Sequence, residues 1–533
     1  MNWFQNLKRQ VAAPAASQAM LQGAARAAAA GKAEVRRYVV MSRRVRAHSE
    51  ATRRVLLGMS ADLAASHGRG AGSVAATVID SVHEDGPKLA EMSQQAAKRL
   101  RSEAPGMLVV PEVFYAPAVH LLLPQVKPGG PARVKTRARK SARKAGRRKT
   151  PGRMTIAVHD ADGAPVSGAG VVVFSDLAAE AGVDGITNAA GKFAFSTSGF
   201  ARIELLIVYP EKTYWSAVKR NVPLGDVARV RVNRIDLGYT DCLRHFYGYG
   251  ADGDGLDVRV GVIDSGVALD HPDLEVAGGA CTISGEDPVS FGALGGDHGS
   301  HVAGIIAARG KAPSGIRGIA PGVELRSYRV FDAGEGASNF SIVRAIDTAV
   351  EEGCDLINMS LGGGPRDAAT EAAIEDARAR GAVCIVAAGN DGGGWVSQPG
   401  AFGLCVAVSA AGRVGTFPRS AADTLDVASP YGTDPKDFLA RFSNVGPEID
   451  ATGPGVGVIS TVPGGHAEMS GTSMACPAVT GVAARLLSRR ANRPILEAPR
   501  DQDRADAITR MLLRSCRALG LGYNHEGNGL PRA

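Results

Sequence analysis

Apolar and polar residues in the second half of the chain form short, nearly continuous apolar runs that alternate with longer segments of helical spacing. Five of these runs predict buried strands, at residues 257–264, 324–331, 354–363, 382–390 and 404–411. Between them, the segment 339–353 places Ile342, Ile346 and Val350 on one helical stripe. Strands that are apolar on both faces and alternate with helices are typical of a parallel sheet covered by helices on both sides. We therefore predict an α/β domain over residues 237–533.

The first part of the chain follows a different pattern. Residues 1–35 are rich in alanine with scattered charges, which predicts a flexible N-terminus. Residues 36–123 predict a small α+β unit of the order β-α-β-α-β. Its expected elements are a strand at 36–45, a helix at 49–68, a strand at 73–82, a helix at 86–103 and a strand at 106–117.

Residues 153–236 combine short alternating strands with D-G, S-G and A-G turns, which predicts an all-β sandwich. The phrases "DADGAPVSGAGVVVF" and "TNAAGKFAF" resemble carboxypeptidase-regulatory-like and immunoglobulin-like sandwich modules. A Pro/Gly-containing linker, residues 124–152, precedes this module and carries ten Lys or Arg and no acidic residue between Arg133 and Lys149. We interpret it as a solvated linker; a tether to nucleic acid or another anionic surface is the alternative. No aromatic residues interleave with the charges for base stacking, so nucleic acid is disfavoured as a partner.

Composition narrows the class of protein further. With 533 residues, of which 45% are hydrophobic, the chain can build several cores, and its net charge of +8 comes largely from the basic linker. We find no transmembrane run and no secretory signal, so no membrane partner is expected. The seven cysteines are odd in number and form no C-x-x-C pair, which argues against a zinc site or a complete disulfide set. These features predict a cytoplasmic protein, with secretion by an atypical route as the alternative.

Four polar residues mark a candidate active site. Asp264 and Asn390 each end a predicted strand, and Ser473 lies where a helix begins, so that backbone N–H groups face it. His298 precedes another helix, whereas His301 lies one turn inside it and is expected to pack. Each residue alone has an ordinary explanation as a turn or helix cap. Together they lie at the carboxyl edge of one parallel sheet, where active sites collect, in the order Asp, His, Ser of one known catalytic triad.

The segments around these residues resemble the subtilisin-like serine proteases, the subtilase family. The matching segments are "VGVIDSGVALDHPDL" (260–274), "DHGSHVAGIIAA" (297–308), "GIAPGVELRSYRVF" (318–331), "INMSLGG" (357–363), "AAGN" (387–390), "ARFSNVGPEIDATGPGVGVISTVPGG" (440–465) and "GTSMACPAVTG" (471–481). The resemblance implies that Asp264 orients His298, that His298 acts as general base and then general acid, and that Ser473 attacks the peptide carbonyl. It also implies that Asn390 and the Ser473 N–H form an oxyanion hole. The implied protein is a serine endopeptidase acting on protein or peptide substrates through an acyl-enzyme.

The resemblance extends to substrate binding. The segments "SLGG" and "AAGN" would line the pocket for the residue before the scissile bond, and a segment near 334–336 would pair with the substrate backbone as an added strand. The residues expected to bind substrate in these ways are Ser360, Leu361, Gly362, Gly334, Gly336, Ala388 and Gly389.

Two further family features bear on this chain. Asp273 matches a position that supplies a calcium ligand, but the loop 308–318 lacks side-chain carboxylates, so calcium is disfavoured there and no cofactor is expected to be required. The unit 36–123 resembles a subtilase prodomain, which implies an intramolecular chaperone and inhibitor in a chain that processes itself. Residues 412–438 are interpreted as an inserted surface loop.

Other interpretations remain open at this point. An inactive subtilase used for binding is the main alternative, although all four chemical positions are filled. An α/β-hydrolase is disfavoured because Ser473 lies in "GTSMA" and not in G-x-S-x-G, and a metalloprotease because no H-E-x-x-H occurs. Cys476, three residues after Ser473, has no base assigned to it and is expected to be a small buried neighbour; a regulatory thiol is the alternative.

Overall fold

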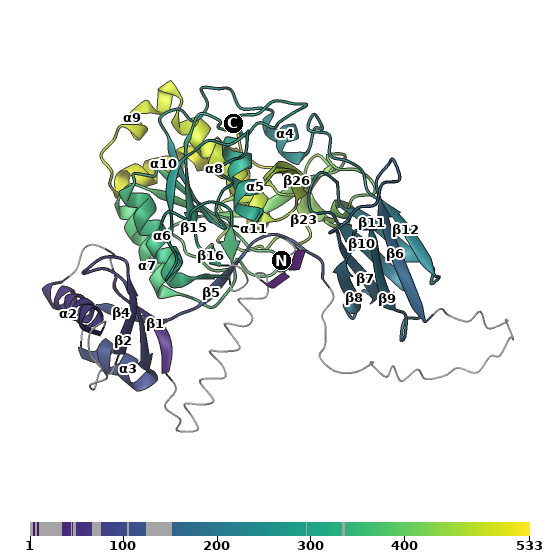
Figure 1. Cartoon of the computed structure of the whole chain (residues 1–533). Coiled ribbons are helices and arrows are strands. Elements are labelled where there is room, and N and C mark those ends of the chain that lie inside the picture. Colours follow the sequence, from purple (N-terminus) through teal and green to yellow (C-terminus); the bar gives the residue numbers. More distant parts are fainter. Residues whose placement is uncertain are drawn as a thin grey trace.

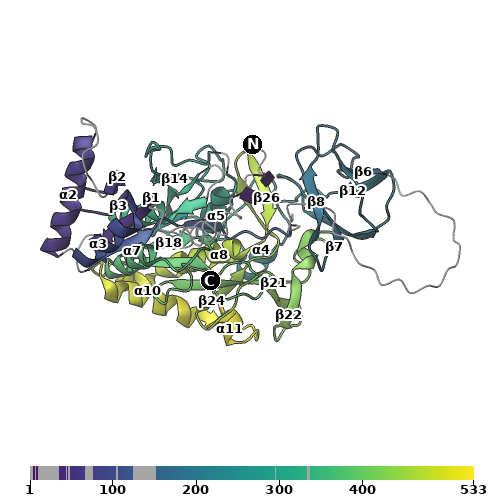
Figure 2. The ribbon, with the colours of Figure 1, turned by 90° about the horizontal axis from the view of Figure 1, so that it is seen from below.

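The computed structural model describes residues 4–5, 8–9, 35–43, 45, 49–66, 76–103, 106–123, 152–294, 296–332 and 336–532. Three bodies are seen in it (Figure 1): an N-terminal unit (residues 35–111), a two-sheet unit (residues 153–235) and a large α/β domain. Figure 2 shows the N-terminal unit and the two-sheet unit at opposite ends of the α/β domain. The basic run at 133–149 and most of the alanine-rich N-terminus lie outside the described residues. Among the helices that are described, none is both long and apolar enough to cross a membrane.

The α/β domain is built on a nine-stranded sheet of the order β14-β15-β13-β18-β20-β21-β23-β22, with β24 also paired to β21. Its strands are β13 (Arg259–Asp264), β14 (Val276–Cys281), β15 (Glu324–Arg329), β18 (Leu356–Met359), β20 (Val383–Ala387), β21 (Val406–Arg413), β22 (Val427–Tyr431), β23 (Asp437–Ala440) and β24 (Ala451–Pro454). All pairs are parallel except those of β23 with β21 and β22. The segment 412–438 is therefore no simple surface loop, because it supplies β22 and the start of β23 at the sheet edge.

Helices cover both faces of this sheet, as the apolar strands predict. The longer helices are α5 (His298–Ala307), α6 (Asn339–Glu351), α7 (Ala368–Ala379), α8 (Thr472–Leu487) and α10 (Gln502–Ser515). Val262 of β13 packs with Val302 and the other apolar residues of α5, α8 and α10, whereas the next residue, Ile263, packs with Ile346 and the residues of α6 and α7. Successive strand residues point to opposite faces, so one strand serves both cores.

Shorter elements complete the domain. They are α4 (Cys242–Tyr247), β16 (Phe331–Asp332), β17 (Gly336–Ser338), β19 (Leu361–Gly362), η1 (Ala422–Leu425), β25 (Val458–Val462), β26 (Gly465–Met469), η2 (Arg490–Asn492), α9 (Arg493–Leu496), β27 (Cys516–Arg517), α11 (Tyr523–Glu526) and β28 (Leu530–Pro531).

The N-terminal unit is a four-stranded antiparallel sheet of the order β2-β3-β1-β4 with two helices. Its elements are β1 (Val35–Ser42), α2 (Glu50–Ser66), β2 (Ala76–Ser81), β3 (Lys88–Ser93), α3 (Gln94–Glu103) and β4 (Met107–Pro111). The helix predicted over 86–103 is wrong for its first half, which forms β3. In β3, Ala90 and Met92 pack inside the unit, while Leu89 packs with the α6 and α7 core of the α/β domain. Burial on both faces favours a strand there over the predicted helix.

The two-sheet unit has a sheet of the order β11-β10-β7-β8 and a second of the order β12-β6-β9, which share one apolar core. Its strands are β6 (Arg153–His159), β7 (Gly170–Asp176), β8 (Ala181–Ile186), β9 (Lys192–Ser196), β10 (Ile203–Tyr209), β11 (Ala217–Val222) and β12 (Val227–Arg231). The sheets are antiparallel except for the parallel pair of β12 and β6. Backbone hydrogen bonds from Val218 N–H to the Ser420 carbonyl and from Thr213 N–H to the His466 carbonyl, both 2.9 Å, attach the unit to the α/β domain.

Candidate active site

Asp264 and His298 form a buried pair at the carboxyl edge of the large sheet. Asp264 is the last residue of β13, and His298 is the first residue of α5. Imidazole Nδ1 of His298 lies 2.8 Å from Oδ1 and 3.0 Å from Oδ2 of Asp264. Because a carboxylate only accepts hydrogen bonds, Nδ1 carries the proton and donates it. The other ring nitrogen, Nε2, is buried and has no hydrogen-bond partner within the described part of the chain, so its lone pair can accept a proton.

His301, the competing histidine, lies one turn further along α5. Its Nε2 lies 3.1 Å from the backbone oxygens of Val458 and Ala467, so it donates to backbone and not to a carboxylate. Burial lowers the pKa of His301 to about 3, which keeps the ring neutral at physiological pH. The side chain packs between α5 and the β25–β26 hairpin, as expected of a structural residue.

Ser473 is the second residue of α8 and is fully buried. Its hydroxyl donates to the carbonyl oxygen of Ser360 over 2.9 Å. Its backbone N–H donates to the carbonyl oxygen of Ala118 over 3.0 Å. A free N–H at the start of a helix is a donor that favours negative charge on the oxygen it contacts.

Asn390 supplies a second donor beside Ser473. Its side-chain oxygen accepts hydrogen bonds from the backbone N–H of Thr472 (3.0 Å) and from the Thr472 hydroxyl (2.9 Å). These two bonds orient the amide, whose Nδ2 is buried and lacks a partner among the described residues. An unpaired buried donor costs free energy in the resting state, and a new negative charge on a nearby oxygen would relieve that cost.

A strand from the front of the chain runs through this site. The strand β5 (Phe114–Pro117) leaves the N-terminal unit and becomes the middle strand between β17 and β19 (Figure 1). Its antiparallel pairs are Phe114 with Ser338, Tyr115 with Ala337, Ala116 with Gly362, and Pro117 with Leu361. Beyond it, Ala118 N–H donates to the Ser360 carbonyl over 3.0 Å and His120 N–H to the Ser470 carbonyl over 2.8 Å. The chain thus crosses Ser473 in an extended, substrate-like conformation.

The site therefore contains a buried Asp-His pair, a serine at a helix start and an extended peptide whose Ala118 carbonyl accepts from that serine. A family model described as the subtilase family matches residues 255–528. The chain belongs to the subtilase family. It is a subtilisin-like serine endopeptidase.

Curated relatives agree with this assignment. Subtilisin DY of Bacillus licheniformis is 37% identical over 240 residues, which are 44% of this chain and 78% of the relative. Alkaline elastase YaB of Bacillus sp. (strain YaB) is 38% identical over 279 residues, 52% of this chain and 63% of the relative. Subtilisin E of Bacillus subtilis (strain 168) is 37% identical over 249 residues, which are 46% of this chain and 58% of the relative. The chain therefore spans less than two thirds of the length of the last two.

The relatives overturn the predicted location. Homologues of this subtilase are secreted, extracellular subtilisins, so the cytoplasmic prediction is wrong. That prediction rested on the odd cysteine count and on the N-terminal composition, and neither property depends on where a folded protease works. A buried thiol is stable in either compartment, and six of the seven cysteines of the subtilase are buried.

The predicted substrate-binding residues fall into three groups. Ser360, Leu361 and Gly362 contact the crossing strand directly. Gly336 pairs with Asp332 and is the first residue of β17, whose next two residues pair with β5. Gly334 lies outside the described residues. The last two, Ala388 and Gly389, are buried and make no backbone pair with β5 among the described residues. The Gly389 N–H instead donates to the Thr472 hydroxyl over 3.2 Å, and the Ala388 carbonyl accepts from Ser397.

Several residues at the site carried no signal in the sequence. Ala118 and Val119 lie beside the serine, and Ser470 binds the backbone after them, although none belongs to a motif. Their role depends on bringing segments from opposite ends of the chain together, which a single sequence does not reveal. Cys476, by contrast, is buried as expected, and its thiol contacts Asn358 Oδ1 and the Ile385 carbonyl at 3.2 Å. Burial raises the pKa of this thiol and disfavours a reactive thiolate.

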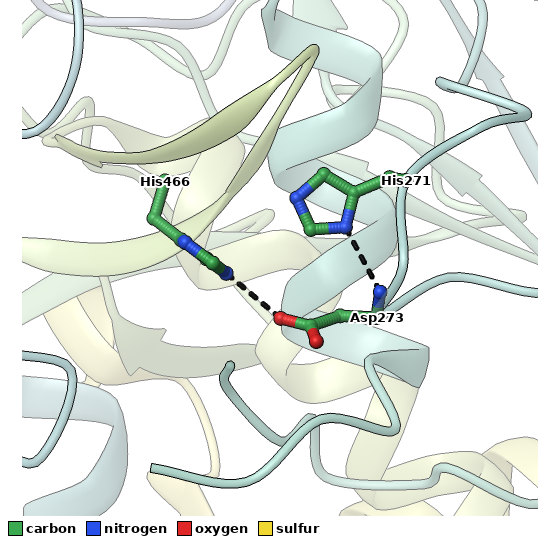
Figure 3. Close-up of side chains that lie close together, drawn as sticks. All are labelled: His271, Asp273 and His466. Carbon is green, nitrogen blue, oxygen red and sulfur yellow. Dashed lines mark hydrogen bonds and ion pairs between the residues drawn. The ribbon is translucent and has the colours of Figure 1, made fainter. Parts of the chain in front are cut away.

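Asp273, the candidate calcium ligand, is already bound by hydrogen-bond donors (Figure 3). Its Oδ2 accepts from Nε2 of His466 over 2.7 Å and from the Ile316 N–H over 2.9 Å. His271 completes the cluster: its Nδ1 accepts from the Asp273 N–H over 3.0 Å and its Nε2 donates to the Gly465 carbonyl over 2.9 Å. Calcium takes six to eight oxygen ligands, so a carboxylate oxygen bound by the Ile316 N–H and the His466 ring does not fit that ion.

Proposed function

We propose that Asp264, His298 and Ser473 are the catalytic triad of this endopeptidase and that the Ser473 N–H and Asn390 form its oxyanion hole. The hydrogen bond from Ser473 N–H to the Ala118 carbonyl carries this proposal, because it presents the carbonyl of an extended peptide to the serine. The 2.8 Å contact between His298 and Asp264 supports it further, since it holds the tautomer that leaves Nε2 free.

In the proposed reaction the same residues act in both halves, first in the formation of the acyl-enzyme and then in its hydrolysis. Ser473 turns its hydroxyl from the Ser360 carbonyl toward His298, and Nε2 takes the proton as Oγ attacks the substrate carbonyl carbon. The charge that develops on the oxygen is stabilised by the Ser473 N–H and by Asn390 Nδ2. His298 then gives the proton to the departing amide nitrogen, the peptide bond breaks, and the acyl-enzyme is hydrolysed by water through the same base. Asp264 stays ionised and stabilises the imidazolium.

We further infer that the chain is made as a precursor that cuts itself between Ala118 and Val119, and that the N-terminal unit is its prodomain. The strand register supports this bond, because the Ala118 carbonyl accepts from Ser473 N–H and the Ala118 N–H donates to the Ser360 carbonyl, while His120 N–H donates to the Ser470 carbonyl on the far side. The packing of Leu89 on the α6 and α7 core and the contact of 2.6 Å between Arg344 and Asp80 support an inhibitor that docks on the protease. The two-sheet unit, a candidate carboxypeptidase-regulatory-like or immunoglobulin-like module, follows the cut and would stay with the protease.

We infer that no cofactor is required. The lack of side-chain carboxylates in the loop 308–318 supports this inference, and so do the two hydrogen bonds that Asp273 Oδ2 already accepts from His466 and Ile316.

Self-cleavage is tested with the purified full-length protein and its Ser473→Ala variant. Incubation followed by mass spectrometry of new N-termini is expected to give a terminus at Val119 in the wild type and none in the variant. Wild-type cleavage at another bond would contradict the register, and no cleavage would contradict the precursor. A fluorophosphonate probe separates an active enzyme from an inactive binding protein: labelling of the wild type and not of Ser473→Ala is expected, and a folded wild type that resists the probe would overturn the triad.

A further inference from the structure

The sheet β11-β10-β7-β8 of the two-sheet unit is apolar on both faces. In β7, Val171 and Val173 point into the core shared with the second sheet, while Val172 and Phe174 point the other way; all four are fully buried. The neighbouring β10 repeats this pattern. An antiparallel sheet with one solvated face would carry polar residues at the outward positions. The outer face of this sheet is therefore built to be covered.

The residues just after the proposed cut cover part of that face. Leu121, Leu122 and Leu123 pack against it together with Leu425 of the protease. The Leu122 N–H donates to the Tyr209 hydroxyl of β10 over 3.2 Å. These contacts place the third, fourth and fifth residues after the proposed scissile bond on the two-sheet unit and not on the protease alone.

An unrelated segment uses the same face. Phe4 is fully buried in this cluster and its ring stacks on Tyr209, with centroids 6.1 Å apart and planes at 26°. Apolar side chains from two separate parts of the chain thus pack on one apolar surface.

A cavity of about 750 Å³ connects this face with the active site. Its lining runs from Asn390 and Ser470 at the site to Leu177, Leu205 and Tyr209 of the two-sheet unit. The second residue after the cut, His120, is among the lining residues, and its ring stacks on that of Phe442 with centroids 4.7 Å apart. The protease and the two-sheet unit therefore form the two walls of one channel on the leaving-group side of the scissile bond.

We propose that the two-sheet unit is a substrate-binding module, and that it selects polypeptides with apolar side chains at the third to fifth residues after the cleaved bond. This inference rests on the proposed function. Residues 119–122 line this cavity, and Leu121, Leu122 and Leu123 cover the apolar face. When they leave it after self-cleavage, the apolar face is open to the corresponding part of a substrate. The hydrogen bonds of Val218 and Thr213 to the protease fix the distance between the two walls, so the spacing from Ser473 is built into the fold.

The test compares two fluorogenic peptides cleaved by the self-processed enzyme. Both carry Tyr-Ala-Pro-Ala before the cut and Val-His after it, followed by Leu-Leu-Leu in one and Ser-Ser-Ser in the other. The leucine peptide is expected to have a kcat/KM about tenfold higher, since a single methylene in an apolar subsite is worth that much. In Leu177→Ser combined with Tyr209→Phe, the ratio between the peptides falls toward one. Val227→Ser, which replaces a side chain 55% exposed on β12 of the opposite sheet, leaves the ratio as it is in the wild type.

The outcomes are distinct. Equal cleavage of the two peptides by the wild type would contradict the proposed substrate-binding role of the two-sheet unit. An unchanged ratio of the two kcat/KM values in the double variant would also contradict it. If the double variant unfolds below the assay temperature, Leu177→Ser alone removes one apolar side chain of this face and is expected to lower the ratio by part of the same amount. Cleavage of neither peptide, together with no fluorophosphonate labelling, would reject the proposed function itself and not the module.

Discussion

The backbone N–H of Ser473 contacts the carbonyl oxygen of Ala118 over 3.0 Å. Ser473 lies at the start of helix α8, and Ala118 directly follows β5, a strand from the front of the chain. This contact aligns the Ala118–Val119 bond with the serine, and it makes the segment 114–120 a bound peptide whose subsites can be tested one by one.

The backbone of Gly471 lies beside that bond. A Cβ added at Gly471 would lie 2.6 Å from the Ala118 carbonyl oxygen and 2.9 Å from Val119 Cα, closer than carbon atoms approach. We therefore expect Gly471→Ala to slow self-cleavage by about a hundredfold or more, as seen when a reacting group is displaced by about 1 Å. Time-resolved mass spectrometry of the precursor measures this rate. Gly403→Ala, where an added Cβ meets nothing within 4 Å, is the matched control; self-cleavage of Gly471→Ala at the control rate would contradict the register.

Asn390→Ala removes the unpaired side-chain donor. We expect kcat to fall by about 10²–10³ with a small change in KM, a magnitude that comes from subtilisin itself and that reflects a bond made only in the transition state. Steady-state cleavage of a Tyr-Ala-Pro-Ala substrate measures both constants. Asn528→Ala, which removes an exposed amide bonded to the Asp450 carbonyl, is expected to have no effect. A rise in KM at constant kcat would show that Asn390 binds substrate without stabilising the oxyanion.

Tyr115 predicts a preference four residues before the cut. Its side chain is fully buried in a cluster with Ala337 and Phe340, and its hydroxyl donates to Asp367 over 3.3 Å. Because burial of an aromatic ring is a large apolar gain, Tyr-Ala-Pro-Ala p-nitroanilide is expected to be cleaved about tenfold faster in kcat/KM than Ala-Ala-Pro-Ala p-nitroanilide. Equal rates for the two substrates would mean that this pocket belongs to the prodomain contact alone.

The hydrogen bonds at Asp273 predict that calcium does not change the thermal stability of the protein. Removing calcium with EDTA, or adding it in excess, is expected to leave the Tm unchanged, because a ligand stabilises a fold only by binding it. Asp273→Asn is expected to cost about 1–3 kcal/mol, since the charged acceptor of the His466 and Ile316 donors is lost. Differential scanning calorimetry in the Ser473→Ala background measures both effects without self-digestion. A rise of Tm with calcium that disappears in Asp273→Asn would reverse the conclusion.

His301 predicts a loss of stability in acid. Its pKa is about 3 in the folded protein and about 6.5 when unfolded, so below pH 6.5 the unfolded chain binds the proton and the folded one does not. The stability that neutral His301 provides is complete above pH 6.5 and falls with the pH toward 3, by about 2–3 kcal/mol at pH 4.5. We expect His301→Gln, which keeps an amide donor for the Val458 and Ala467 carbonyls, to show a smaller fall in Tm between pH 7 and pH 4.5. Equal falls in both proteins would assign the acid sensitivity to other groups.

Local patterns in the sequence predicted the α/β domain and the candidate residues for its chemistry. Apolar runs marked the strands because a parallel sheet must be buried on both faces, and Asp264, His298, Asn390 and Ser473 stood in motifs at the ends of those elements. The family resemblance of the segment "SLGG" likewise predicted where substrate would bind. Each of these signals lies within a few residues of the group that it describes.

Tertiary structure decided what depends on distant segments. The spacing of residues 88–93 suits a helix, but burial against two cores makes them the strand β3. Nothing near Ala118 marks it as the partner of Ser473, since their contact exists only once β5 pairs with β17 and β19. The donors of His466 and Ile316 at Asp273, and the apolar outer face of β7 and β10 beside the active site, arise in the same way. Local sequence reports the backbone preferences and the chemistry of a segment, whereas the free energy of burying it depends on neighbours that only the folded chain brings together.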